Sequence, residues 1–78
     1  MIEVQINGVK EQLEPDTTVS VVLESKQVRP EMVAVEINGE LVQKGKYPTL
    51  TLQSGDVMEF LHYMAGGNGH FYYQPKIT

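Results

Sequence analysis

Two Asn-Gly dipeptides, at residues 7–8 and 38–39, constrain the fold of this chain more than any other feature of its sequence. Asn-Gly between runs of alternating apolar and polar residues is the strongest short-range signal for a β-hairpin. Residues 2–6 alternate in this way before the first dipeptide, and residues 33–37 alternate before the second. The sequence therefore predicts two β-hairpins with about twenty residues between them.

A short helix is predicted between the two hairpins. Val19 and Leu23 lie at positions i and i+4, so they fall on one helical face. Thr17 or Thr18 can cap the N-terminus of this helix. The pattern favours a helix over residues 19–27, and its β-branched residues are mediocre helix formers, so tertiary packing must hold it in place.

A late strand follows an irregular connection at residues 44–48 and a tight turn at residues 54–56. From residue 57 to residue 64, apolar residues again recur at every second position. The resulting order, β-β-α-β-β-β, favours an α+β domain with the β-grasp (ubiquitin-like) architecture: a mixed sheet of four to five strands with one main helix on one face. In this architecture the late strand lies beside the first strand, in the middle of the sheet. The alternative is a small β-barrel that carries one turn of helix.

Length and charge exclude several classes of function. A chain of 78 residues forms one domain with a small core, which favours a binding or carrier role over an enzyme with a deep cleft. The net charge of −4 makes nucleic acid a poor partner and suits partners with basic docking faces. The chain has no cysteine, which fits a cytoplasmic location, and no stretch is long and apolar enough to predict a membrane span. We expect a monomer when the protein is free.

Gly66-Gly67 follows the predicted last strand directly. The segments Pro30–Gly39 (PEMVAVEING) and Gly55–Gly67 (GDVMEFLHYMAGG) resemble, in order and spacing, two regions of the ThiS family, the sulfur carrier proteins of thiamine biosynthesis. The resemblance covers residues 1–67. Carriers for molybdopterin synthase and for cysteine or homocysteine biosynthesis are related to this family, and the sequence separates them poorly.

The resemblance implies a β-grasp fold and a carrier, not an enzyme. It implies that the carboxyl group of Gly67 becomes an acyl adenylate and then a thiocarboxylate that delivers sulfide. The partners it implies are an E1-like adenylating enzyme, which uses ATP and Mg²⁺, and a sulfur-accepting synthase such as thiazole synthase. No bound cofactor and no metal site are expected in the carrier itself. Glycine has no Cβ, so Gly66 allows the chain end to lie extended in a narrow channel of the partner.

This chain departs from the family pattern because eleven residues, 68–78, follow the diglycine. In the first hypothesis the chain is a precursor with a carrier domain at residues 1–67, and a peptidase of the JAMM type cuts the bond between Gly67 and Asn68. In the second, the tail folds back, either as a strand over residues 70–73 that pairs beyond the end of the sheet or as a cover on an apolar patch. In the third, sulfur transfer has been lost and the tail is a docking peptide for a partner. Half of the six aromatic residues lie in this tail, which is unusual for an inert segment.

The other candidate residues all have structural interpretations. The two histidines, without a matching carboxylate spacing, do not predict a metal site, and the one in the last strand is expected to be a satisfied structural residue. The two histidines are His62, in the last strand, and His70. Met58, Phe60 and Met64 of the last strand are expected in the core rather than on a partner-facing patch. Lys44 and Lys46 are expected in a solvated loop, and Asp56 is expected to cap a turn.

Overall fold

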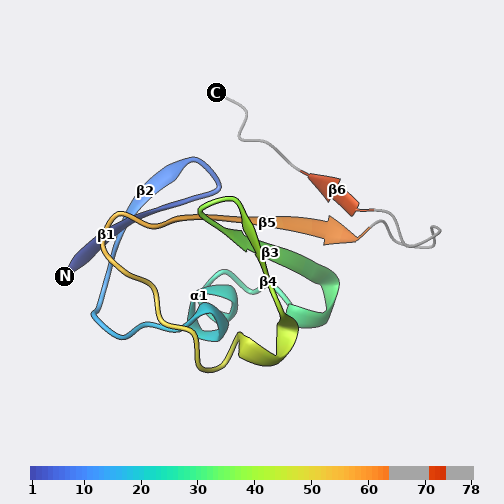
Figure 1. The fold of residues 1–78 in the computed structure, drawn as a ribbon, viewed down its shortest axis with the longest axis horizontal. Coiled ribbons are helices and arrows are strands. Elements are labelled where there is room, and N and C mark those ends of the chain that lie inside the picture. The colour runs from blue at the N-terminus through green and yellow to red at the C-terminus, as the bar shows by residue number, and fades with distance from the viewer. Residues whose placement is uncertain (64–70, 74–78) are drawn as a thin grey trace.

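The computed structural model describes residues 1–63 and 71–73 of the chain, and Figure 1 shows the arrangement of its elements. Two β-hairpins, a helix and a long late strand follow one another in the predicted order, and a short strand comes after them. The elements are β1 (Ile2–Ile6), β2 (Val9–Leu13), α1 (Val19–Ser25), β3 (Val33–Ile37), β4 (Glu40–Val42), β5 (Val57–Tyr63) and β6 (Phe71–Tyr73), with 3₁₀ turns at Pro30–Met32 and Lys44–Lys46.

The strands form one mixed sheet in the order β2-β1-β5-β3-β4, with β6 paired to β5 outside this path. Strand β5 lies between the two hairpins, parallel to β1 and antiparallel to β3. The prediction of a mixed sheet of four to five strands, with the late strand beside the first, is confirmed by this five-strand path. The strands do not close into the barrel considered as an alternative, because β2 and β4 form the two ends of the path.

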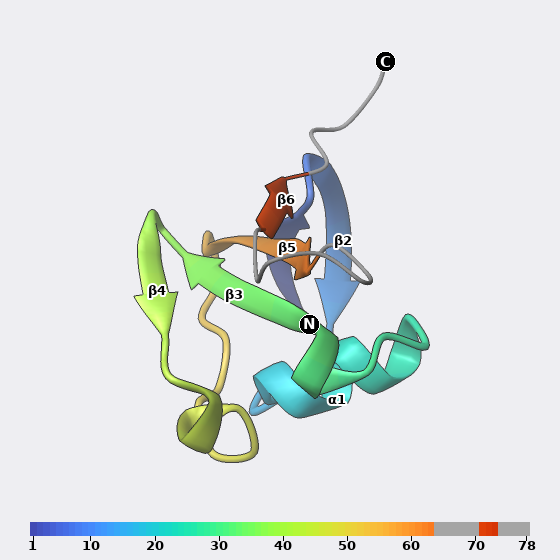
Figure 2. The same cartoon turned by 90° about the vertical axis from the view of Figure 1, so that its right-hand side faces the viewer.

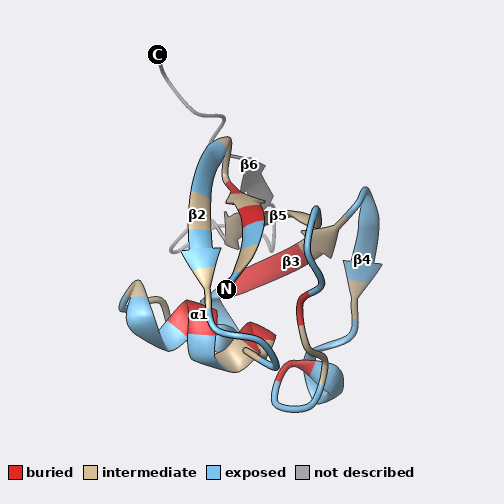
Figure 3. Cartoon of the chain, turned by 90° about the vertical axis from the view of Figure 1, so that its left-hand side faces the viewer, coloured by how far each residue is buried: buried red, intermediate tan, exposed pale blue. Residues whose placement is uncertain are grey.

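The hydrophobic core lies between one face of the sheet and α1, which crosses below it in Figures 1 and 2. The buried residues lie on α1, on the central strands and in the connection before β5, as the red segments of Figure 3 show, and they form one cluster. In β1 and β5 the buried positions alternate, which is the period expected of strands with one face on a core, whereas the first three residues of β3 are all buried. The core comprises Val4, Ile6, Val19, Val22, Leu23, Val33, Val35, Tyr47, Leu52, Met58 and Phe60.

Helix α1 begins and ends with side-chain and backbone caps. The hydroxyl oxygen of Thr18 accepts a hydrogen bond from the N–H of Val21 at 3.2 Å, so of the two predicted capping threonines it is Thr18 that caps. The helix ends at Ser25, two residues before the predicted end, because Gln27 takes the left-handed conformation with φ 60°. The N–H groups of Gln27 and Val28 then bond to carbonyls of the last helical turn, which is the Schellman arrangement. Within the described part of the chain, no helix has the length and hydropathy that crossing a membrane requires.

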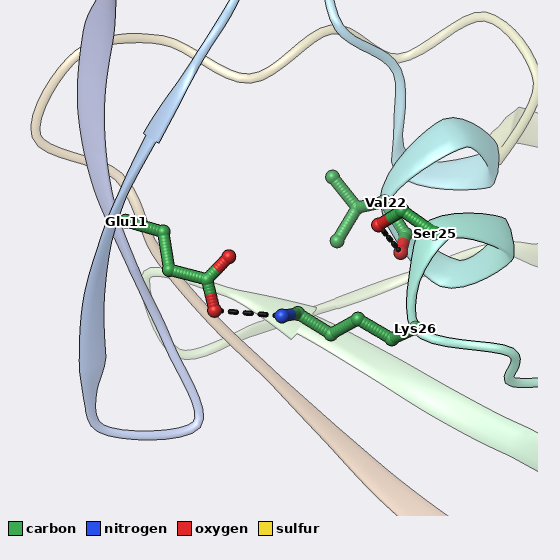
Figure 4. Close-up of polar contacts among 4 residues, drawn as sticks. All are labelled: Glu11, Val22, Ser25 and Lys26. Atoms are coloured by element: carbon green, nitrogen blue, oxygen red, sulfur yellow. Dashed lines mark hydrogen bonds and ion pairs between the residues drawn. The ribbon is translucent and has the colours of Figure 1, made fainter.

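One ion pair ties the C-terminal end of α1 to the first hairpin. Lys26 Nζ lies 2.7 Å from Glu11 Oε2 on β2, and both side chains are about one-third exposed or less (Figure 4). Ser25 Oγ donates a 2.7 Å hydrogen bond to the carbonyl of Val22 one turn earlier. A partly exposed pair of this kind contributes at most about 1 kcal/mol, so the ion pair fixes the direction of the helix end more than it adds stability.

The long connection between β4 and β5 closes the core beside α1. Backbone hydrogen bonds join Val19 N–H to the Leu50 carbonyl and Leu52 N–H to the Thr17 carbonyl, so this segment runs along the N-terminal end of the helix. Tyr47 is buried, and its hydroxyl donates to the carbonyl of Val33 at 3.4 Å. The connection therefore supplies backbone partners to the start of α1 and one large side chain to the core.

The left-handed residue at the end of α1 leads to a first prediction. Gln27→Gly should raise the free energy of unfolding by about 0.5–1 kcal/mol, because glycine adopts positive φ without a steric penalty from Cβ. Urea denaturation measures the change. Gln27→Ala is the control, since alanine keeps the Cβ, and it should leave stability close to that of the parent chain. A destabilised Gln27→Gly variant would contradict the Schellman assignment.

Candidate functional site

The candidate site is the C-terminal end of β5, from which the chain leads to the diglycine. Strand β5 is described to Tyr63, and three residues further along the chain comes Gly66. Gly66 and Gly67, the predicted acyl carriers, and the predicted cleavage junction Gly67–Asn68 lie outside the described residues. Three residues span at most about 10 Å, so the diglycine starts close to the end of the central strand.

The asparagines of both hairpin turns are bonded to β5. Asn7 and Asn38 have φ values of 49° and 54°, as the first residue of a type I′ turn requires. Asn7 Oδ1 accepts a hydrogen bond from the N–H of Phe60 at 3.0 Å, and Asn38 Oδ1 accepts one from the N–H of Val57 at 2.9 Å. The sequence predicts both residues only as turn formers. No local signal reveals the second role, because each partner lies far along the chain and is brought near only by the insertion of β5.

Strand β1 pairs with only the first two residues of β5, Val57 and Met58. Beyond Asn7 the same edge of β5 is taken by β6, which runs antiparallel to it with His62 opposite Tyr72. In Figures 1 and 2, β6 lies on the opposite side of β5 from α1. The hypothesis that the tail returns as a strand is confirmed for residues 71–73. The predicted place, beyond the end of the sheet, is wrong: Leu61 and His62 pair with β6 on one side and with β3 on the other, because β1 ends early and leaves that edge of β5 free.

The sheet face turned away from α1 carries an acidic pair. Glu36 on β3 and Glu59 on β5 are direct cross-strand partners, and both are half-buried. The next cross-strand pair on the same face is Ala34 and Leu61, which lies closer to the C-terminal end of β5. This face therefore combines negative charge with a small apolar area beside the point where β5 ends.

The remaining candidate residues of β5 belong mainly to the core. Met58 and Phe60 are buried, as predicted, whereas Met64 lies outside the described residues. His62 packs edge-to-face against the Phe60 ring, with ring centroids 6.0 Å apart. The expectation of a satisfied histidine is not borne out, since among the described residues the buried Nδ1 atom of His62 has no hydrogen-bond partner. His70 lies outside the described residues.

Loop residues outside β5 take structural positions. Asp56 Oδ2 accepts a hydrogen bond from the N–H of Gln53 at 2.8 Å, which confirms its predicted role as the cap of the turn before β5. Lys44 Nζ donates to the Glu31 carbonyl at 3.2 Å, and Lys44 and Lys46 are exposed in a 3₁₀ turn. Over the residues that the structure describes, no three His, Cys, Asp or Glu side chains gather closely enough to hold a metal ion.

A shallow depression lies at the other end of β5. Leu41, Leu50 and Asp56 are among the residues that line it, and Asp56 directly precedes the first residue of β5. The chain continues toward the diglycine from Tyr63, the last residue of the same seven-residue strand. The depression therefore lies at the opposite end of β5 from Tyr63, the last described residue before the diglycine.

Comparison with known proteins links this chain to one family. The ThiS family model matches residues 3–67. The chain is 36% identical over 64 residues to the sulfur carrier protein ThiS of Bacillus subtilis, which covers 81% of this chain and 97% of that protein. It is 35% identical over 66 residues to a thiazole synthase of Magnetococcus marinus, covering 85% of this chain but only about a fifth of the synthase.

Solved structures agree with the family match. The crystal structure of the thiamine biosynthesis protein ThiS from Geobacter metallireducens superposes with a TM-score of 0.73 at 30% identity, covering 85% of this chain and 100% of that one. The solution structure of a thiamine biosynthesis protein from the same organism gives a TM-score of 0.66 at 27% identity, covering 96% of this chain and 100% of that one.

The hydrogen bond from Phe60 to Asn7 leads to a second prediction. Asn7→Gly keeps the positive φ but removes the acceptor of the Phe60 N–H, so the free energy of unfolding should fall by about 1–2 kcal/mol. Asn7→Asp is the matched control, because aspartate tolerates the same conformation and retains a side-chain oxygen. Urea denaturation of both variants measures the difference. Equal losses in the two variants would show that the bond to β5 contributes nothing.

The acidic cross-strand pair leads to a third prediction. Like charges directly opposite on a sheet are destabilising, so Glu36→Lys should raise the free energy of unfolding by about 0.2–1 kcal/mol at low salt. Glu36→Gln should give a smaller gain, because it removes the repulsion without adding attraction. The gain of the lysine variant should shrink in 1 M salt, where the Debye length is about 3 Å. A gain that is independent of salt would mean that charge is not its cause.

Proposed function

This chain belongs to the ThiS family, and on that premise we propose that it is a sulfur carrier protein that delivers sulfide for thiamine (thiazole) biosynthesis. The sulfur is carried as a thiocarboxylate on Gly67. The match of the family model to residues 3–67, which ends at the second glycine of the pair, is the observation that carries the proposal.

The chemistry requires a free carboxyl group on Gly67. A carboxylate is a poor acyl donor, so the adenylating partner joins it to the α-phosphate of ATP and releases pyrophosphate. Sulfide then attacks the acyl carbon and displaces AMP, which leaves the thiocarboxylate with no change in the oxidation state of sulfur. The synthase that accepts the sulfur returns Gly67 to a carboxylate. The adenylating enzyme holds the ATP and Mg²⁺, and this chain supplies the acyl group.

The contribution of the domain is to position the diglycine. Strand β5 is bonded to β1 and to β3 and is fixed further by Asn7 and Asn38, so the chain leaves the sheet from its best-held strand. Glycine at positions 66 and 67 leaves the backbone narrow enough for the partner to surround it. The acidic pair Glu36 and Glu59 lies on the sheet face turned away from α1, four residues before the end of β5, and suits a partner with basic residues, which would speed their encounter.

Residues 68–78 require a processing step in this proposal. In the precursor a peptide bond joins Gly67 to Asn68, so a peptidase of the JAMM type must cut it before adenylation. Relative length supports this step: the 64 matched residues make up 97% of the Bacillus subtilis carrier, which is therefore about twelve residues shorter than this chain. The domain proposed for the mature carrier is residues 1–67.

The destination of the sulfur is proposed from the synthase relative. In Magnetococcus marinus, a segment similar to this chain forms about a fifth of a thiazole synthase. A carrier must bind its sulfur acceptor. Because a segment similar to this chain is part of a thiazole synthase in that organism, thiazole synthase is the favoured acceptor for this chain. The carriers for molybdopterin, cysteine or homocysteine are the alternatives within the same chemistry. We place the free carrier in the cytoplasm as a monomer, where ATP and its partners are available.

Adenylation of defined chain ends tests the proposal. A chain ending at Gly67 should release pyrophosphate when incubated with its host's adenylating enzyme and ATP, whereas the full-length chain should release none. In the shortened chain, Gly67→Ala should lower kcat/KM by about 100-fold, because the added Cβ displaces the acyl carbon in the channel. The intact mass of the protein from its own host should correspond to residues 1–67, with or without an oxygen-to-sulfur exchange.

The same experiment distinguishes the competing function, an interaction module that docks a partner through its tail. That function predicts that removal of residues 68–78 abolishes partner binding and that Gly67→Ala has no effect. Recovery of only the full-length chain from host cells in which the pathway is induced would count against the carrier.

A further inference from the structure

The backbone of β5 has one stretch of edge that β1 does not reach. Successive residues of a strand direct their N–H and C=O groups to opposite sides. The Asn7 N–H bonds to the Met58 carbonyl, and the Phe60 N–H bonds to Asn7 Oδ1, so even-numbered residues of β5 face the β1 side. The Asn38 N–H bonds to the Val57 carbonyl, so odd-numbered residues face β3. His62 therefore directs both backbone groups toward the edge beyond the end of β1.

Strand β6 occupies this stretch of edge. Leu61, His62 and Tyr63 are paired with Tyr73, Tyr72 and Phe71 in antiparallel register. In an antiparallel ladder, every second pair of opposite residues exchanges both backbone hydrogen bonds. Because His62 directs its backbone groups toward this edge, His62 and Tyr72 form such a pair. The N–H groups of Phe71 and Tyr73 point away from β5 by the same rule. The tail thus satisfies backbone groups on β5 that would otherwise form an open, strand-accepting edge.

The pairing also fixes the two ends of the segment that contains the diglycine. Residues 64–70 connect Tyr63 to Phe71, and these two residues are partners across the β5–β6 ladder. Their backbones are therefore about 5 Å apart. A segment of seven residues that threads a narrow channel in extended form spans about 24 Å. Both conditions cannot hold at once, so β6 must leave β5 before the whole segment of residues 64–70 can lie extended in a partner.

We propose that residues 71–73 are an intramolecular strap, which masks a strand-accepting edge at the C-terminal half of β5 and is released with the extension. The uncut chain is then inactive as a carrier for two reasons. Gly67 has no free carboxyl group, and the edge beside the exit of β5 is occupied. The consequence for access to the diglycine rests on the proposed function, whereas the masking of the β5 edge does not.

Amide hydrogen exchange tests the masking directly. The His62 amide should be protected in the full-length chain and should exchange about tenfold faster or more in the chain ending at Gly67, which loses its partner strand. The Leu61 amide faces β3, so it should stay protected in both chains and report that the shortened domain is folded. We expect the shortened chain to fold, since 85% of this chain aligns with all of the Geobacter metallireducens crystal structure. Equal exchange of the His62 amide in the two chains would overturn the proposal.

Two proline variants of the full-length chain test the register. Tyr72→Pro removes the N–H that faces His62, whereas Tyr73→Pro removes one that points away from β5. Both variants lose a tyrosine and gain a proline, so they are matched. Tyr72→Pro should speed exchange of the His62 amide about tenfold, and Tyr73→Pro should leave it within about twofold of the parent chain. The opposite order, or equal effects, would overturn the assigned register.

Limited digestion with a broad-specificity protease tests the consequence for access. Proteases bind extended segments, so cleavage within residues 64–70, mapped by mass, should be about tenfold faster in Tyr72→Pro than in the full-length parent or in Tyr73→Pro. Equal rates in the three chains would show that β6 does not restrict the connection. These readouts need neither the adenylating enzyme nor the host peptidase, so failure of the strap and failure of the carrier function are distinguishable.

Discussion

The fold depends on the insertion of β5 between β1 and β3. This strand is the last of the domain in sequence, yet it joins the two hairpins into one sheet and places Met58 and Phe60 in the core. Its ladder is parallel on one side and antiparallel on the other, and the two turn asparagines bond to its N–H groups from either side. Without β5 each hairpin would be a two-stranded unit with both outer edges unpaired, which is marginally stable in water.

The same insertion explains why the candidate site lies where it does. Strand β3 pairs with β5 as far as His62, which gives the C-terminal end of β5 a defined position and direction from which the chain leads to the diglycine. The carrier therefore needs no cleft of its own. Since β1 ends early, the insertion also leaves part of the β5 edge unpaired, and the tail of this chain takes that edge as β6.

Local patterns in the sequence predicted most elements because their causes are local. The two Asn-Gly turns, the alternation in β1, β3 and β5, and the threonine before α1 each act through neighbours within a few residues. The sequence predicts the end of α1 two residues too late, because backbone hydrogen bonds stabilise the left-handed Gln27 and glutamine has no preference for that conformation. The side-chain bonds from Asn7 and Asn38 to β5 were not predicted at all, since their partners are distant in sequence.

By itself, the sequence determined the order of the elements from β1 to β5 and most core positions of the helix and of the central strands, but not the core residues Tyr47 and Leu52 of the long connection. These follow from residue type and period, which act over a few residues. Only the tertiary structure decided that β1 stops after two pairs with β5 and that β6 takes the remaining edge. Strand pairing depends on which backbone edges remain free once the sheet has formed, and that property belongs to the assembled fold and not to any segment of the chain.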